Sequence, residues 1–148
     1  MNTHPNLRAY LAGVFVPTLA LPLMLTGVII VRLVLALPVP VERFVIFPMA
    51  FVPTLWGLWN MLWLCSHSRT GLAVGVHGAA LPVLLLPLGA LAASSLGILA
   101  IGPHGVVWFN AVDVPYSLIA PCWLAAIAGY YLIWKFIVGF LNRLMGIE

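Results

Sequence analysis

The sequence predicts an all-α integral membrane protein, a bundle of four transmembrane helices with proline-kinked helices and short loops. Three observations support this class. Charged residues make up 6% of the 148-residue chain, against about 25% in an ordinary soluble domain. Hydrophobic residues make up 64%, and they gather in four long stretches separated by short polar segments. A soluble protein of this size could not cover its surface with so few charges, so a bilayer is the expected solvent.

The four apolar stretches run over about 7–37, 44–65, 72–101 and 116–140. Each is long enough to span, because about 20 apolar residues cross a hydrocarbon core of about 30 Å. The first and third are longer than needed, so we expect them to tilt, bend or emerge into the headgroups. The first is also too long for the core of a cleaved signal peptide, so we expect it in the mature protein. Together they predict a single transmembrane domain over residues 1–148.

Each stretch carries a pair of prolines, within it or at its start, five or six residues apart, namely Pro17/Pro22, Pro48/Pro53, Pro82/Pro87 and Pro115/Pro121. A proline inside a helix removes one backbone hydrogen bond and clashes with the carbonyl one turn back. Pro48 and Pro115 lie near helix starts, where the missing N–H costs nothing. Bends are therefore predicted at the remaining positions, Pro17, Pro22, Pro53, Pro82 and Pro87, with Pro121 as a further candidate.

The repeated proline pairs leave open whether the chain arose by duplication. The pairs of the first two stretches recur in the last two, which would suit a duplicated helical hairpin. The pentapeptide Phe15–Leu19 recurs without change as Phe51–Leu55, on consecutive stretches. That repeat implies a different symmetry, so the two patterns do not describe one simple duplication.

Close helix packing is predicted in the third stretch. Gly71, Gly75 and Ala79 recur there at four-residue spacing, and small residues at this spacing let helices approach closely. The third helix is therefore the expected packing centre of the bundle.

The basic residues predict the orientation of the chain. Basic residues favour the cytoplasmic face, so both termini are predicted to be cytoplasmic, in a plasma membrane or a bacterial inner membrane. The predicted cytoplasmic face holds four basic residues and the outer face two, in the order Arg8, Arg69, Lys135 and Arg143, then Arg32 and Arg43.

Polar groups inside a bilayer are costly and are therefore candidates for function. His77 lies in the third stretch, and we interpret it as a buried packing residue, with a proton-relay or ligand contact as the alternative. Asn60 lies in the second stretch close to Trp56. The tryptophans of this stretch suggest an interfacial aromatic belt. The alternative is an aromatic wall around a lipid or cofactor pocket, with Asn60 as its polar contact.

The two outer connections contain the remaining candidate residues. His104 and Asp113 lie in one connection, and Glu42 and Arg43 lie in the facing loop. A His with carboxylates and an Arg could form an acid–base site. The competing interpretation is a solvated rim with one salt bridge, because the four residues show no recognisable spacing.

Several function classes find no support in the sequence. No Asp or Glu falls inside a predicted span, which disfavours proton- and cation-coupled carriers. The four histidines are too scattered for a zinc site or a haem held by two histidines, so no metal or cofactor is expected. There is no Lys/Arg cluster for nucleic acid, and no motif of hydrolases, phosphate loops or zinc proteases.

By elimination, the sequence favours a non-enzymatic membrane subunit that packs against other transmembrane helices, in a homo-oligomer or a larger complex. Its expected partners are membrane lipids and those helices. One alternative is a channel or facilitator for a small or apolar solute, with a cavity at proline-broken helices. Another is a membrane enzyme that acts on lipid or quinone at the outer loops.

Overall fold

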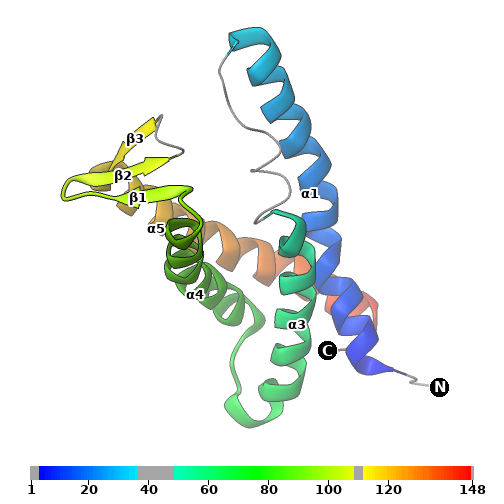
Figure 1. Ribbon diagram of the computed structural model, residues 1–148. Helices are drawn as coiled ribbons and strands as arrows, with labels where there is room; N and C mark the ends of the chain where they lie inside the picture. Colours follow the sequence, from blue (N-terminus) through cyan, green and yellow to red (C-terminus); the bar gives the residue numbers. More distant parts are fainter. Residues whose placement is uncertain (1–3, 37–48, 109–111, 148) are drawn as a thin grey trace. The chain divides into compact units, whose positions relative to one another are not determined.

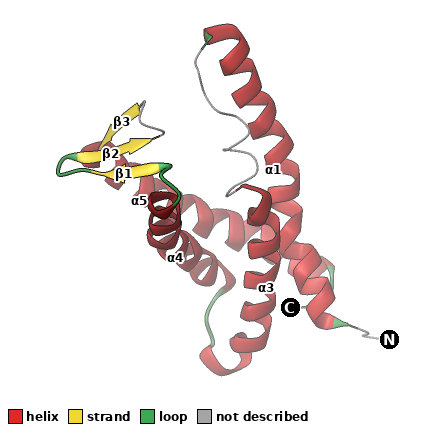
Figure 2. Ribbon diagram, in the orientation of Figure 1, coloured by secondary structure: helices red, strands yellow, loops and turns green. Residues whose placement is uncertain are grey.

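A computed structural model describes residues 4–36, 49–108 and 112–147. Helices dominate the described chain (Figures 1 and 2). The four long ones are α1 (Pro5–Leu35), α3 (Val52–Thr70), α4 (Val74–Ser95) and α5 (Tyr116–Ile133). A 3-10 turn, Met49–Phe51, precedes α3. A π-helical turn, Trp134–Val138, continues α5 into α6 (Gly139–Leu144).

Three of the described helical segments are long and apolar enough to cross a membrane. They are Pro5–Val34, Val74–Ser95 and Tyr116–Leu144, with mean hydropathy of 2.4, 1.8 and 1.8. These segments correspond to the first, third and fourth predicted stretches. The prediction of a helical protein with membrane-length helices is therefore confirmed, and it is compatible with an integral membrane location.

The second predicted stretch differs from the helix that forms there. α3 begins at Val52 and ends at Thr70, whereas the prediction ran over 44–65, of which 44–48 lie outside the described residues. The last five residues of α3 are the polar segment Ser66–Thr70. α3 is not among the three spans found in the described chain, so the fourth span stays a prediction.

The third stretch ends earlier than predicted. Its helix was expected to continue to residue 101, but α4 ends at Ser95. The cause is Gly97, whose φ of 68° is left-handed. The amide of Ile98 donates to the Ala93 carbonyl at 2.8 Å, and that of Gly97 to the Ser94 carbonyl at 3.1 Å. This pair of bonds is the Schellman motif that ends helices at glycine.

A small antiparallel sheet follows α4, in a region predicted to be helix end and loop. Its strands are β1 (Leu99–Ile101), β2 (Gly105–Trp108) and β3 (Val112–Pro115), with β2 in the centre. Leu99 pairs with Trp108, and Val107 pairs with Asp113. The segment is rich in valine, which favours a pleated strand, but valine is equally at home in a membrane helix, so the composition did not reveal the sheet.

The chain forms two compact units. The first comprises Met1–Leu72 and Ile137–Glu148, and the second Ala73–Phe136. In the first unit, α1 packs against α3 and α6, and in the second, α4 packs against α5. Few of the described side chains are buried, which is compatible with helices whose outer faces contact lipid.

α1 is buried over its first half only. Ala9, Ala12, Gly13 and Pro17 are buried, whereas every described side chain from Thr18 onward is exposed or half-buried. Only 6% of its most apolar window is buried. The C-terminal half of α1, from Thr18 onward, therefore presents apolar side chains to its surroundings. This half is about 27 Å long at about 1.5 Å per residue.

Among the described residues, five prolines lie inside helices, Pro17 and Pro22 in α1, Pro82 and Pro87 in α4, and Pro121 in α5. Pro53 lies instead in the first turn of α3, where a proline needs no bend. Next to two of these prolines, the Thr18 hydroxyl donates to the Val14 carbonyl at 2.7 Å and the Thr26 hydroxyl to the Pro22 carbonyl at 2.8 Å. These carbonyls are not the ones four residues before a proline, so the hydroxyls do not replace the hydrogen bonds that the prolines remove.

Candidate functional site

The seam between α4 and the helix that begins with α5 is built around two glycines. A Cβ on Gly78 would overlap the side chain of Trp134. A Cβ on Gly75 would lie 3.0 Å from the Cβ of Lys135 and 3.0 Å from the ring of Tyr131. Glycine at these positions lets the two helices approach closely.

The predicted packing residues are distributed differently along this region. Gly75 lies in the seam, and Ala79 is half-buried in α4. Gly71 lies before α4, as the C-cap of α3, with a φ of 62° and no neighbour within 4 Å of a built Cβ. The four-residue spacing did not indicate Gly78, because the seam uses Gly75, Gly78 and Pro82, which are three and four residues apart.

His77 is buried in the seam. Its ring stands edge-on to that of Trp134, with centroids 6.1 Å apart and planes at 64°. The side chain is 8% exposed. This is the geometry of an aromatic packing pair, and the relay or ligand role of His77 stays a prediction.

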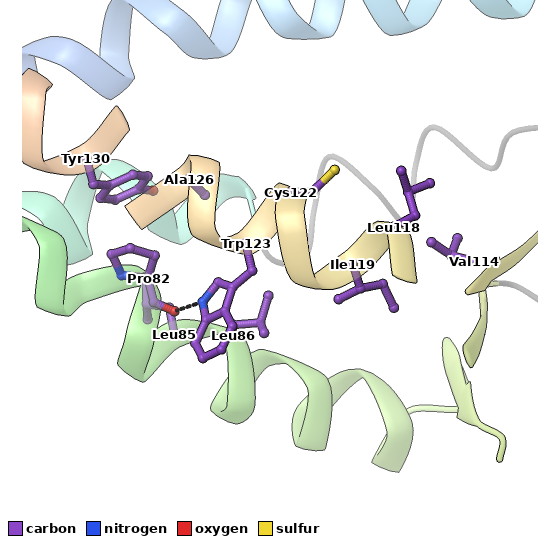
Figure 3. A pocket seen from close by; sticks show the side chains of 10 residues that line it. All are labelled: Pro82, Leu85, Leu86, Val114, Leu118, Ile119, Cys122, Trp123, Ala126 and Tyr130. Carbon is purple, nitrogen blue, oxygen red and sulfur yellow. Dashed lines mark hydrogen bonds between the residues drawn. The ribbon is translucent and has the colours of Figure 1, made fainter. Parts of the chain in front are cut away.

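Further along the seam, an apolar groove of about 450 Å³ lies between α4 and α5 (Figure 3). Trp123 lies at its centre, where the indole N–H donates to the Pro82 carbonyl at 3.3 Å. This bond ties α5 to the proline-containing part of α4. The groove is lined by Pro82, Leu85, Leu86, Val114, Leu118, Ile119, Cys122, Trp123, Ala126 and Tyr130.

A fully buried amide pair lies in the first unit. The Asn60 side chain donates to the Asn142 side-chain oxygen at 2.8 Å and to the Ala9 carbonyl at 2.8 Å. Asn142 donates back to the Asn60 oxygen at 3.2 Å. The pair links α1, α3 and α6. Asn142 was missed because it lies just beyond the predicted end of the fourth span at residue 140.

Trp56 lies in the core of the first unit. It is 3% exposed, and Trp63 on the same helix is 1% exposed. A Cβ on Gly13 of α1 would lie 2.6 Å from the Trp56 carbonyl oxygen, so α1 and α3 touch here through their backbones. Trp56 and Trp63 are thus covered by protein, which does not fit the interpretation as a belt at the membrane surface.

Two of the predicted outer-loop residues line one hollow on the sheet. His104 and Asp113 both border a space of about 280 Å³, and both are exposed. Their predicted neighbours Glu42 and Arg43 lie outside the described residues. Within residues 4–36, 49–108 and 112–147, no three His, Cys, Asp or Glu side chains come together as a metal site would require.

Comparison of the chain with protein-family models, curated proteins and solved structures finds no match. The α4–α5 seam with its groove is the strongest candidate, because it combines close helix contact, an apolar hollow and a cation, Lys135, at one end. Such a site can bind an apolar partner.

Proposed function

We propose that this chain is a four-span integral membrane protein that acts as a non-enzymatic subunit, packing against other transmembrane helices. The partner helices belong to further copies of the chain or to a larger complex. Both termini are assigned to the cytoplasmic side of a plasma or bacterial inner membrane, following the bias of the basic residues.

The observation that carries this proposal is the contrast between two sets of helical glycines. At Gly13, Gly57 and Gly78, a built Cβ would come within 3 Å of a neighbouring helix. At Gly27, Gly89 and Gly129, one on each membrane-length segment, it would meet nothing within 4 Å.

Glycine inside a helix costs roughly 0.5–1 kcal/mol relative to alanine, and in membrane helices small residues gather at helix–helix interfaces. The chain uses its packed glycines in this way. The glycines without a neighbour, Gly27, Gly89 and Gly129, therefore support the proposal that helices of a partner pack against these faces.

The channel alternative draws less support from the groove. A solute path through proline-broken helices would use the carbonyls that the prolines leave unbonded. For Pro82 and Pro87 these lie four residues earlier, on Gly78 and Val83, and neither residue lines the groove. The enzyme alternative has His104 and Asp113 in one hollow, and no Ser, Thr, Cys or Lys is among the described residues that line it.

The test is native mass spectrometry of the full chain in a mild detergent. We expect a species heavier than the monomer. Gly129→Leu should reduce that species at least fivefold, because a bulky side chain prevents close approach at the open face.

The matched control is Ala120→Leu on the same helix. Ala120 is exposed and lies nine residues from Gly129, on the opposite side of a helix with about 100° per residue. It should leave the heavier species unchanged. A wild-type chain that is strictly monomeric at all protein concentrations would contradict the proposal.

A further inference from the structure

The groove between α4 and α5 has the dimensions of a site for a single hydrocarbon chain. On α5 it extends from Leu118 to Tyr130, about 18 Å at about 1.5 Å per residue. Its volume of about 450 Å³ over that length gives a mean cross-section of roughly 25 Å². A helix is about 10 Å across with its side chains and would rest over such a groove with only some side chains inside it. A single hydrocarbon chain can lie along the groove.

The walls of the groove select an apolar occupant. The lining is almost entirely aliphatic and aromatic, as Figure 3 shows. The indole N–H of Trp123 is bonded to the Pro82 carbonyl and is not directed at an occupant. A polar headgroup would lose its hydration here without replacement, so only a hydrocarbon tail suits the groove.

A cation lies on the same seam beyond the groove. Lys135 is the only Lys or Arg in Ala73–Phe136, and the only carboxylate there, Asp113, is in β3. The Lys135 ammonium lies 5.5 Å from the Tyr131 ring centroid and 5.4 Å from that of Phe136. These contacts hold the charge at the exposed end of the seam.

The spacing along the helix puts this cation at headgroup depth. Tyr116 and Lys135 are about 28 Å apart along the helix, close to the hydrocarbon thickness of about 30 Å. With Tyr116 at one interface, Lys135 reaches the other, where lysine side chains extend toward water. A tail that starts at Lys135 would cross one leaflet, about 15 Å, and run along the groove past Tyr130 and Ala126.

We propose that the α4–α5 groove binds one acyl chain of an anionic glycerophospholipid whose phosphate pairs with Lys135. The inference rests on the membrane location in the proposed function, but not on assembly with other helices.

Native mass spectrometry of the full chain also tests this inference. The protein is purified in a mild detergent and supplied with phosphatidylglycerol or with phosphatidylcholine of the same acyl chains. We expect one phosphatidylglycerol retained per chain, about fivefold in preference to phosphatidylcholine, the effect of one basic residue near an anionic headgroup. Lys135→Gln should abolish that preference.

Filling the groove tests the position of the tail. In Ala126→Trp the indole occupies the groove, and retention of both lipids should fall at least tenfold. Ala125→Trp is the control, because Ala125 is exposed but does not line the groove. Circular dichroism shows whether each variant keeps its helices, and Lys135→Gln remains decisive should the tryptophan variant fail to fold.

Equal retention of the two lipids by the wild type would overturn the inference, as would wild-type retention by a folded Ala126→Trp. Loss of a dimer in Ala126→Trp with lipid binding intact would identify a second copy as the occupant and would also overturn it. A monomer that retains phosphatidylglycerol would reject helix assembly while supporting this site. A protein that is soluble without detergent would reject the membrane location itself.

Discussion

At the scale of single residues, the buried amides of Asn60 and Asn142 decide how the first unit holds together. Both side chains are fully buried, and each donates to the other. Asn60 also donates to the Ala9 carbonyl of α1. A buried amide without a partner costs about 1–3 kcal/mol, so the pair is stabilising only while both members are present.

Replacing either asparagine with leucine should therefore destabilise the first unit. We expect Asn60→Leu or Asn142→Leu to lower the free energy of unfolding by about 1–3 kcal/mol. The double variant should lose less than the sum, because it leaves no amide stranded. The coupling expected for hydrogen bonds between membrane helices is about 0.6 kcal/mol, with a maximum near 1.7. Reversible unfolding in mixed micelles measures all four proteins of the cycle.

Leu62→Met on α3 is the control for this cycle. Leu62 is 50% exposed, so the change should have little effect. Strictly additive losses in the double variant would show that the two amides act independently, against the geometry described.

At the scale of elements, glycine determines where helices touch. α4 carries both a packed and an unpacked glycine. A Cβ built on Gly78 would overlap the side chain of Trp134, whereas a Cβ built on Gly89 would have no neighbour within 4 Å. The two positions are eleven residues apart on one helix, so their helix propensities are comparable. Alanine substitutions at the two positions therefore separate the effect of helix packing from the effect of helix propensity.

Gly78→Ala should destabilise the second unit by about 1–3 kcal/mol, the usual effect of overpacking, because the new methyl group must displace Trp134. Gly89→Ala should be neutral or stabilising by up to about 1 kcal/mol, since alanine is the better helix former. Thermal unfolding in detergent, followed by circular dichroism, measures both. A stabilising Gly78→Ala would show that α4 and Trp134 are not in close contact.

The same elements show what the sequence could predict. The length of the apolar stretches predicted α1, α4 and α5, because hydropathy alone dictates a membrane-length helix. The end of α4 before Gly97 was not predicted, because a single glycine in an apolar stretch is tolerated inside a helix. The strands after it were missed because their valines also suit a membrane helix.

The site was harder to predict than the helices. Asn60 and His77 could be chosen from the cost of burying polar groups, but their contacts with Asn142 and Trp134 depend on tertiary packing. The groove could not be found from sequence, because its lining residues resemble those of any lipid-facing helix. The packing roles of Trp123 and Gly78 follow only from the contact between α4 and the helix that begins with α5.

At the scale of the whole molecule, the number of crossings depends on α3. This helix ends in the polar segment Ser66–Thr70 and is not among the membrane-length segments of the described chain. The stretch predicted to cross began at residue 44, so its first five residues lie outside the described part. Whether α3 crosses also decides on which side the C-terminus lies.

Labelling of single cysteines with a membrane-impermeant maleimide distinguishes the two topologies. Cys65 and Cys122 are first replaced with serine, and one cysteine is then placed at His4, Ser68, His104 or Ile147. With four crossings, positions 4, 68 and 147 share one side and position 104 lies on the other. With three crossings, 4 and 104 share one side, and 68 and 147 share the other.

We expect the four-crossing pattern, with positions 4, 68 and 147 protected in intact cells and position 104 labelled. That pattern puts Arg8, Arg69 and Arg143 on the cytoplasmic side, as the distribution of basic residues predicts. Labelling of all four positions after permeabilisation controls for thiols that are hidden by protein. If positions 4 and 104 label together, α3 does not cross, and the basic residues of the two ends would then lie on opposite sides of the membrane.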